Sequence, residues 1–259
     1  AIAGIANGSL RPSGVSLSGS SFSSNTAKTY GGAVAIGGPY NNNQYGNLLI
    51  EDSSFSDNSS ESSQSSAGGA VYVNVGVTND VTVYQSSFSD NLSEISAGAI
   101  YVTGAGSLTI QLSKFIDNAA TGQSNVYDRY GGAVLVDDIA ELIVSNSLFG
   151  GNKAEGSSTL GYGGAISAQD VENIAFTNSI FAENSSTDNG GALFFYNSTA
   201  ALVLNNTLLG NESADGGAGS FNGTPTTLIN NIFAYSAGDT ISSTQSMSSS
   251  VNYNDWYQN

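Results

Sequence analysis

The chain has 259 residues, of which 5 are Lys or Arg and 21 are Asp or Glu, so its formal net charge is −16. Nucleic acid and anionic membrane surfaces are excluded as partners, because both require clustered basic side chains. The sequence contains no His and no Cys, which excludes a Ser-His-Asp triad, imidazole or thiolate metal sites, a Cys nucleophile and disulfides.

No apolar run approaches the roughly 20 residues that a membrane-spanning helix needs, so we expect no membrane insertion by this segment. The first predicted element lies at residues 14–25, where an alternating strand pattern leads into a Phe-x-x-Asn phrase. This phrase returns along the chain, with a weaker copy at residues 208–211. Its aromatic members are Phe22, Phe55, Phe88, Phe115, Phe149 and Phe181, and its amide members are Asn25, Asn58, Asn91, Asn118, Asn152 and Asn184.

A second phrase, Gly-Gly-Ala followed by an aliphatic residue, stands between successive copies of the first. It occupies residues 31–34, 68–71, 131–134, 163–166 and 190–193, with a degraded copy at 97–100. The two phrases alternate with a mean period of roughly 31 residues. A fixed period of this length is typical of solenoid repeats.

Apolar residues alternate with polar ones after each Gly-Gly-Ala and before each Phe. Val71 and Val73 show the first pattern, and Leu108 and Ile110 show the second. A period of two predicts strands, and two or three such short strands per repeat are covered only if neighbouring repeats stack on them. We therefore predict an all-β, single-stranded parallel β-helix, right-handed, with about eight coils in one domain over residues 1–259.

Stacking places equivalent residues of successive coils over one another. We expect the Phe column to form an internal aromatic stack and the Asn column to form a ladder of side-chain amides at a turn. The paired glycines would supply a positive φ and a close backbone approach at another corner.

The alternation of Gly-Gly-Ala-[Ile/Val/Leu] with Phe-x-x-Asn, from residue 22 to about residue 220, resembles the repeat of the chlamydial polymorphic membrane proteins. The last residues, 251–259, are similar to late coils of right-handed β-helix repeat proteins. The first resemblance implies a β-helical passenger domain of a surface-exposed, autotransporter-type adhesin. The expectations are a cell-surface or extracellular location, a fragment of a longer surface protein and a non-enzymatic role in adhesion or display.

Tyrosines supply the candidate ligand contacts. Some lie at outward strand positions on adjacent coils, where they suit sugar stacking or a protein partner, although strand propensity and cover by a loop also explain them. Others lie in the inserts at residues 37–46 and 119–130, where an arginine either contacts a ligand or pairs with Asp128. The candidates are Tyr72, Tyr101, Tyr40, Tyr45, Tyr127, Arg129 and Tyr130.

Carboxylates recur at equivalent positions and give three interpretations: a solvated face, a Ca²⁺ site or a catalytic pair. The candidate metal ligands are Asp57, Asp90, Asp117, Asp138 and Asp170. Asp138 and Asp170 belong to a wider acidic group with Asp137, Glu141 and Glu172. Calcium is the one cofactor that the sequence suggests, and we predict no catalytic residues.

A cell-surface protein or a glycan is the expected partner, with self-association as the alternative. Two other functions stay open: a subunit of an extracellular filament or sheath that assembles end to end, and a polysaccharide-acting hydrolase or lyase.

Overall fold

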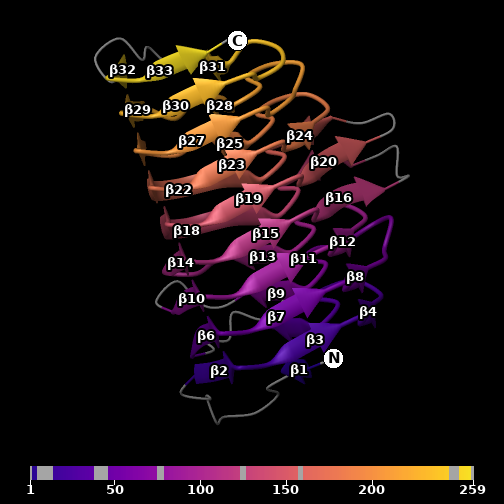
Figure 1. Ribbon diagram of the computed structural model, residues 1–259. Helices are drawn as coiled ribbons and strands as arrows, with labels where there is room; N and C mark the ends of the chain where they lie inside the picture. Colours follow the sequence, from indigo (N-terminus) through magenta and orange to yellow (C-terminus); the bar gives the residue numbers. More distant parts are fainter. Residues whose placement is uncertain are drawn as a thin grey trace.

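The computed structural model describes residues 14–37, 46–74, 79–122, 127–156, 160–244 and 251–257 in full, and residues 2–4 as backbone. Throughout these ranges the regular structure is β-strand, and no helix occurs. Figure 1 shows the strands rising from the N-terminus to the C-terminus as a stack of coils, each lying on the one before.

The largest sheet, sheet A, has 16 strands in the described residues and two strand positions per coil. The first position, after the glycine pair, holds β1 (Ile2–Gly4), β5 (Val34–Ile36), β9 (Val71–Asn74), β13 (Ile100–Thr103), β25 (Leu193–Tyr196), β28 (Gly219–Asn222) and β31 (Ile241–Ser243). The second position holds β2 (Gly14–Ser18), β6 (Asn47–Glu51), β10 (Asp80–Tyr84), β14 (Ser107–Gln111), β26 (Ala200–Leu204), β29 (Thr226–Ile229) and β32 (Val251–Asn252). Two longer strands, β18 (Val134–Ser145) and β22 (Ile166–Thr177), span both positions.

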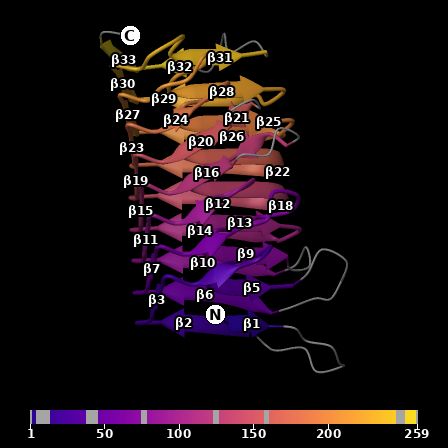
Figure 2. The ribbon, with the colours of Figure 1, turned by 90° about the vertical axis from the view of Figure 1, so that its right-hand side faces the viewer.

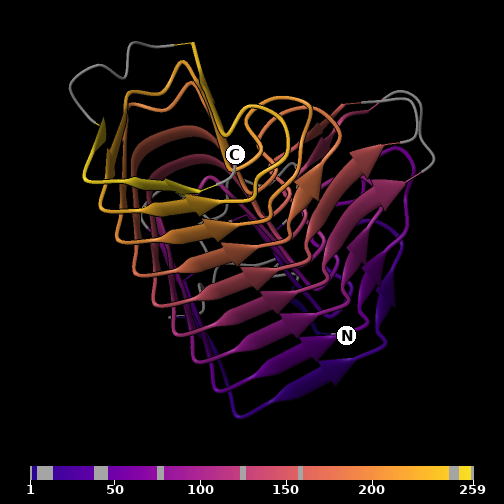
Figure 3. The same ribbon diagram turned by 45° about the horizontal axis from the view of Figure 1, so that its top comes forward.

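Sheet B follows sheet A in each coil and carries the Phe column. It consists of β3 (Ser21–Ser23), β7 (Ser54–Ser56), β11 (Ser87–Ser89), β15 (Lys114–Ile116), β19 (Leu148–Gly150), β23 (Ile180–Ala182), β27 (Thr207–Leu209), β30 (Ile232–Ala234) and β33 (Asp255–Tyr257). Figure 3 shows these arrows side by side along the front of the stack.

Sheet C follows the Asn column and is short. It consists of β4 (Thr26–Ala27), β8 (Ser59–Ser60), β12 (Leu92–Ser93), β16 (Ala119–Gly122), β20 (Lys153–Gly156) and β24 (Ser185–Ser186). A two-stranded sheet of β17 (Arg129–Tyr130) and β21 (Gly161–Tyr162) lies before the glycine corner. Figure 2, turned by 90° from Figure 1, shows the same stacking from the side.

Every strand pair in the described residues is parallel and in register between coils, as β13 and β18 illustrate with Ile100 opposite Val134. This arrangement confirms the prediction of an all-β parallel solenoid. The hand of the coil stays a prediction. Sheet B contributes nine strands in the part of the chain that is described, against about eight coils expected, because Leu208, Phe233 and Trp256 continue the Phe column.

The core lies inside the coils and consists of the columns that the alternation predicted. The apolar residues after each glycine pair and before each Phe are buried, for example Val71, Val73, Leu108 and Ile110, each 0% exposed. Burial of aliphatic side chains along the whole stack supplies the main stabilisation, at about 25 cal/mol per Å² of apolar surface.

The Phe column forms the expected internal stack. The ring centroids of Phe55 and Phe88 lie 4.7 Å apart with an interplanar angle of 3°, and those of Phe88 and Phe115 lie 4.8 Å apart. This spacing matches the separation of neighbouring strands, about 4.8 Å. The stack continues through Phe149 to Phe181.

The Asn column forms the expected amide ladder. In each step the Nδ2 group of one Asn donates to Oδ1 of the next, as from Asn91 to Asn118 at 2.9 Å. The same Nδ2 group also donates to the Phe carbonyl of the preceding coil, as from Asn118 to Phe88 at 3.0 Å. From Asn58 to Asn211 the ladder residues are 0% exposed. Their side-chain amides are therefore satisfied by protein groups and not by bulk water.

The two glycines of the corner have different roles. The first glycine has a positive φ, as Gly131 does at 64°. A Cβ on the second would collide with backbone from two other segments: at Gly32 it would lie 2.6 Å from the Ser59 carbonyl oxygen and closer still to that of Gly69. The corner therefore packs sheet C backbone directly against the chain entering sheet A.

Candidate functional site

Tyrosines precede the glycine pair at one corner of the coil. Tyr130 in β17 is opposite Tyr162 in β21, and isolated bridges extend this column to Asn189 and Asp215 on the next coils. The rings of Tyr130 and Tyr162 stack with centroids 5.0 Å apart and an interplanar angle of 17°. The corner thus holds a short outer row of aromatic rings.

Strand β25 adds two aromatic side chains beside this row. Phe194 packs on Tyr162 with ring centroids 4.9 Å apart, and Tyr196 lies 6.3 Å from Phe194 in a nearly parallel plane. Phe194 is 4% exposed and Tyr196 is 50% exposed. Phe194 therefore forms the floor, while Tyr196 presents its ring to solvent.

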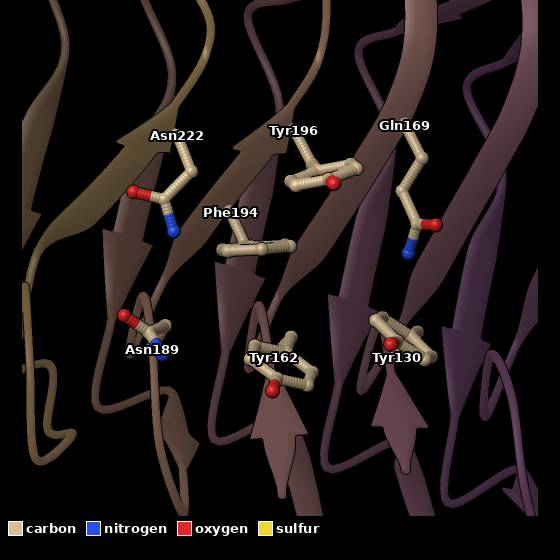
Figure 4. Close-up of a pocket in the computed structure, with 7 residues that line it drawn as sticks. All are labelled: Tyr130, Tyr162, Gln169, Asn189, Phe194, Tyr196 and Asn222. Atoms are coloured by element: carbon tan, nitrogen blue, oxygen red, sulfur yellow. The ribbon is translucent and has the colours of Figure 1, made fainter. Parts of the chain in front are cut away.

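These side chains line an open groove of about 370 Å³. Its aromatic lining is Tyr130, Tyr162, Phe194 and Tyr196, and its polar lining is Gln169, Asn189 and Asn222. Figure 4 shows two rows across neighbouring coils, Asn189–Tyr162–Tyr130 and Asn222–Tyr196–Gln169, with Phe194 between them. The groove, defined by these seven residues, is called the aromatic groove below.

Several polar groups of the aromatic groove are held by neighbours. The Ser220 hydroxyl lies 3.3 Å from Asn189 Oδ1, and the Asn189 amide donates to the carboxylate of Asp188. Gln169 donates weakly to the Ser167 hydroxyl, at 3.4 Å. Hydrogen bonds within the framework fix the orientation of these amides before any ligand arrives.

Burial raises the pKa of the Tyr130 and Tyr162 phenols above the ordinary value, and nearby carboxylates raise it further. For Tyr130 the carboxylate is Asp128, and for Tyr162 the carboxylates are Asp128 and Asp188. Negative charge nearby disfavours a phenolate. Both phenols are therefore neutral hydrogen-bonding groups at physiological pH.

The expectation that Tyr72 is exposed is wrong. Tyr72 is only 3% exposed, because its ring packs between Tyr30, at 4.5 Å between centroids, and Tyr101, at 5.5 Å. Tyr101 is partly buried, and its hydroxyl points to Asp137 Oδ2 at 3.5 Å. Because Tyr30 lies in the connection between β4 and β5, cover by a loop, the alternative explanation, describes Tyr72 better.

Arg129 is also not available on the surface. It is 0% exposed, and its Nη1 donates to the backbone carbonyl of Tyr127. Burial lowers the pKa of the guanidinium, and the carboxylates of Asp128 and Glu94 oppose that shift. The nearby carboxylates are in line with the alternative that Arg129 pairs with Asp128 or another acid.

The other tyrosine candidates divide. Tyr130 lines the aromatic groove, whereas Tyr127 is exposed but does not line it. Tyr40 and Tyr45 lie outside the described residues. The structure thus brings one candidate, Tyr130, together with residues that the sequence analysis did not select as a site.

The carboxylate columns occupy tight turns. Asp57, Asp90 and Asp117 have φ angles of 55°, 55° and 53° between sheets B and C, and Asp138 and Asp170 have 54° and 50° within sheet A. All five side chains are exposed. Asp is among the residues that tolerate this left-handed conformation best, which accounts for the recurrence of Asp without a ligand.

In the described ranges, no three acidic side chains gather closely enough to hold a metal ion together. The Asn197 amide donates to Asp170, so one of the five candidate ligands already has a protein partner. A calcium site on these columns stays a prediction.

Sequence reasoning missed two features. The first is a ladder of buried Ser and Asn two residues before each Phe, in which, for example, the Ser86 backbone N–H donates to the Ser113 hydroxyl at 3.1 Å. The second is the aromatic groove, whose signal is the phrase Tyr-Gly-Gly-Ala at residues 30–33, 130–133 and 162–165. Aligning that Tyr column with Phe194 requires the coil geometry.

Comparison with known families gives one result. Residues 52–74 and 178–196 match the Chlamydia polymorphic membrane protein repeat. Each segment runs from the turn before a sheet B strand, past the Asn ladder and the glycine pair, to the end of a sheet A strand. The second segment includes Phe194 and Tyr196 of the aromatic groove.

No curated protein and no solved structure matches the chain significantly. The described residues form no helix that is long and apolar enough to cross a membrane.

Proposed function

We propose that this chain is a non-enzymatic display region at a cell surface, which adheres to a partner through its aromatic groove. The repeat match supports a surface location, because the matching repeat is named for membrane proteins. The observation that supports adhesion is the aromatic groove, where Tyr196 is 50% exposed above the buried Phe194 ring.

The rigidity of the scaffold supports a display role. Each groove residue stands on or beside a strand that is hydrogen-bonded to coils on both sides, as β22 is to β18 and β25. A site held on regular elements loses little conformational entropy on binding. Exposed aromatic side chains rimmed by polar groups are typical of interaction surfaces.

The carboxylates that could act as catalytic groups support an enzymatic role less well than the aromatic groove supports adhesion. Asp138 and Asp170 are exposed at left-handed turns and do not line the aromatic groove. Asp137 does have a raised pKa, caused first by burial and then by Asp170 and Asp138. Its side chain accepts from Tyr101, which gives it a structural contact.

A cell-binding assay tests the proposal. The fluorescently labelled chain is expected to bind cultured epithelial cells saturably. Tyr196→Ala is expected to raise the Kd of that binding about tenfold. Tyr235→Ala is the matched control, because Tyr235 is 57% exposed and lies outside the groove. Equal binding by Tyr196→Ala and the parent chain would refute adhesion through this groove.

An activity assay tests the non-enzymatic part. Incubation with plant, bacterial and host polysaccharides is expected to release no oligosaccharide. A defined product that disappears in Asp138→Asn would show that the chain is an enzyme.

A further inference from the structure

The lining of the aromatic groove carries no formal charge. Phenols and amides each donate and accept hydrogen bonds, and both kinds of group surround the Phe194 floor. A ligand that satisfies this lining needs an apolar face and many neutral hydroxyl or amide groups at its edge. Sugar rings have this combination, since their C–H faces pack on aromatic rings and their hydroxyls project sideways.

The electrostatic field around the groove disfavours anions. Asp128 and Asp188 lie near the Tyr130 and Tyr162 phenols and raise their pKa. The whole chain has a net charge of −16, so its potential repels sulfated, phosphorylated and sialylated ligands. The charge of the site therefore favours an uncharged ligand.

Two groups on the rim are available to such a ligand. Neither the hydroxyl of Tyr196 nor the side-chain amide of Asn222 makes a hydrogen bond to another of the described residues, and both line the groove. Tyr196 is half-exposed, and Asn222 is partly exposed. Binding can use these groups without breaking a contact within the protein.

The two rows of the aromatic groove run along the axis of the solenoid. They step from coil to coil, with Tyr130 and Tyr162 at 5.0 Å and Tyr162 and Phe194 at 4.9 Å between ring centroids. Figure 4 shows both rows crossing neighbouring coils. This shape fits several linked sugar rings better than one monosaccharide.

Two other ligand classes fit less well. Quaternary ammonium groups bind where aromatic faces surround the cation, whereas Tyr130 and Tyr162 stack on each other. A peptide strand needs an unpaired sheet edge, whereas β25 is paired with β22 on one side and β28 on the other.

We propose that the aromatic groove binds an uncharged oligosaccharide chain that lies along the solenoid axis. This inference rests on the proposed function for the site and adds the class of partner. The half-exposed Tyr196 ring stacks against a sugar ring above the buried Phe194 floor, and the Gln169, Asn189 and Asn222 amides bind the sugar hydroxyls.

Isothermal titration with tetrasaccharides of the cello, chito and malto series tests the inference on the whole chain. At least one series is expected to bind, and Tyr196→Ala is expected to raise its Kd by about tenfold. Tyr196→Phe separates stacking from hydrogen bonding and is expected to retain most of the affinity. Tyr235→Ala is expected to bind like the parent chain.

Sialyllactose, a heparin tetrasaccharide and choline are the comparison ligands. Stronger binding of any of these, binding that Tyr196→Ala leaves unchanged, or no binding of any neutral series would overturn the inference. The cell-binding assay keeps the two proposals distinguishable. If cell binding requires Tyr196 but is not inhibited by excess neutral tetrasaccharide, adhesion through the groove is upheld and the oligosaccharide ligand is ruled out.

Discussion

Asn118 shows how one buried side chain ties three coils together. Its amide donates to the Phe88 carbonyl of the preceding coil and to Asn152 Oδ1 of the next coil, while its own Oδ1 accepts from Asn91. The residue is 0% exposed, so water cannot replace any of these bonds.

Asn118→Ala is expected to lower the free energy of unfolding by about 2–4 kcal/mol, because it leaves several buried polar groups without partners at about 1–3 kcal/mol each. Urea denaturation followed by circular dichroism measures this change. Asn173→Ala, at an exposed position in β22, is the control and is expected to change stability by less than about 0.5 kcal/mol. Equal effects of the two substitutions would contradict the ladder's energetic role.

Asp137 is a partly buried carboxyl whose pKa is raised, first by burial and then by Asp170 and Asp138. A raised pKa means that the folded protein binds the proton more tightly than the unfolded chain does. This contribution to stability is fully present at acid pH and is lost as the pH rises through the folded-state pKa. Ionised Asp137 therefore weakens the fold at neutral pH.

Asp137→Asn is expected to raise the unfolding temperature at pH 7, and this gain is expected to shrink as the pH falls toward 4. Thermal scans across that pH range measure the difference between the two proteins. Asp138→Asn, at an exposed turn, is expected to show a smaller gain. A difference for Asp137→Asn that does not vary with pH would rule out the desolvated carboxylate as its cause.

The corner between sheets C and A depends on the two glycines in different ways. Ala97 occupies the first glycine position with a φ of 55°, so this position accepts a methyl group at the cost of left-handed strain. The second position is Gly in each of the seven copies from Gly32 to Gly217. A Cβ on Gly132 would lie 2.5 Å from the Lys153 backbone nitrogen and closer still to the Gly164 carbonyl oxygen.

Gly132→Ala is therefore expected to destabilise the protein more than Gly131→Ala does. The loss at Gly131 is expected to include about 1–2 kcal/mol for a left-handed non-glycine residue, with a further cost because the added Cβ crowds the Val134 carbonyl of the same turn. The loss at Gly132 is expected to exceed this, because two backbone segments must separate. Chemical denaturation of both variants compares them directly, and a larger loss at Gly131 would invert this assignment of roles.

The strands of the solenoid could be predicted from sequence, because the alternation of apolar and polar residues reports which side chains are buried. The return of the two phrases every roughly 31 residues reports which residues stack. The Phe stack and the Asn ladder followed from the same register. The groove could not be predicted, because Tyr162 and Phe194 meet across two elements of neighbouring coils. The burial of Tyr72 depends in the same way on Tyr30 of the preceding coil.

The recurrence of the carboxylates also has a conformational explanation. Asp57, Asp90 and Asp117 stand where the backbone has a positive φ, so the turn itself favours Asp, and the calcium site stays a prediction. In a solenoid every coil repeats the same turn, so a conformational preference produces a column as readily as a ligand does.

At the scale of the whole molecule, the net charge of −16 acts against the compact stack. Like charges on successive coils repel, and salt screens that repulsion over about 10 Å at 0.1 M ionic strength. Sodium chloride is expected to raise the unfolding temperature by several degrees, and calcium chloride at equal ionic strength is expected to do the same. Differential scanning calorimetry makes the comparison.

A clearly larger shift with calcium, abolished by chelator and by Asp90→Asn, would instead establish a calcium site. Asn retains the left-handed turn, so this variant removes the charge and leaves the backbone intact.

The buried amide ladder also limits the hosts in which this chain can be produced. Asn58, Asn91, Asn184 and Asn211 each begin an Asn-x-Ser sequence, which eukaryotic cells glycosylate in the secretory pathway. These side chains are 0% exposed, so the coil has no room for a glycan attached to one of them. Glycosylation would break the stack at that coil. Expression in a secreting eukaryotic host should yield misfolded glycoprotein unless these four positions escape modification, whereas the bacterial cytoplasm avoids the difficulty.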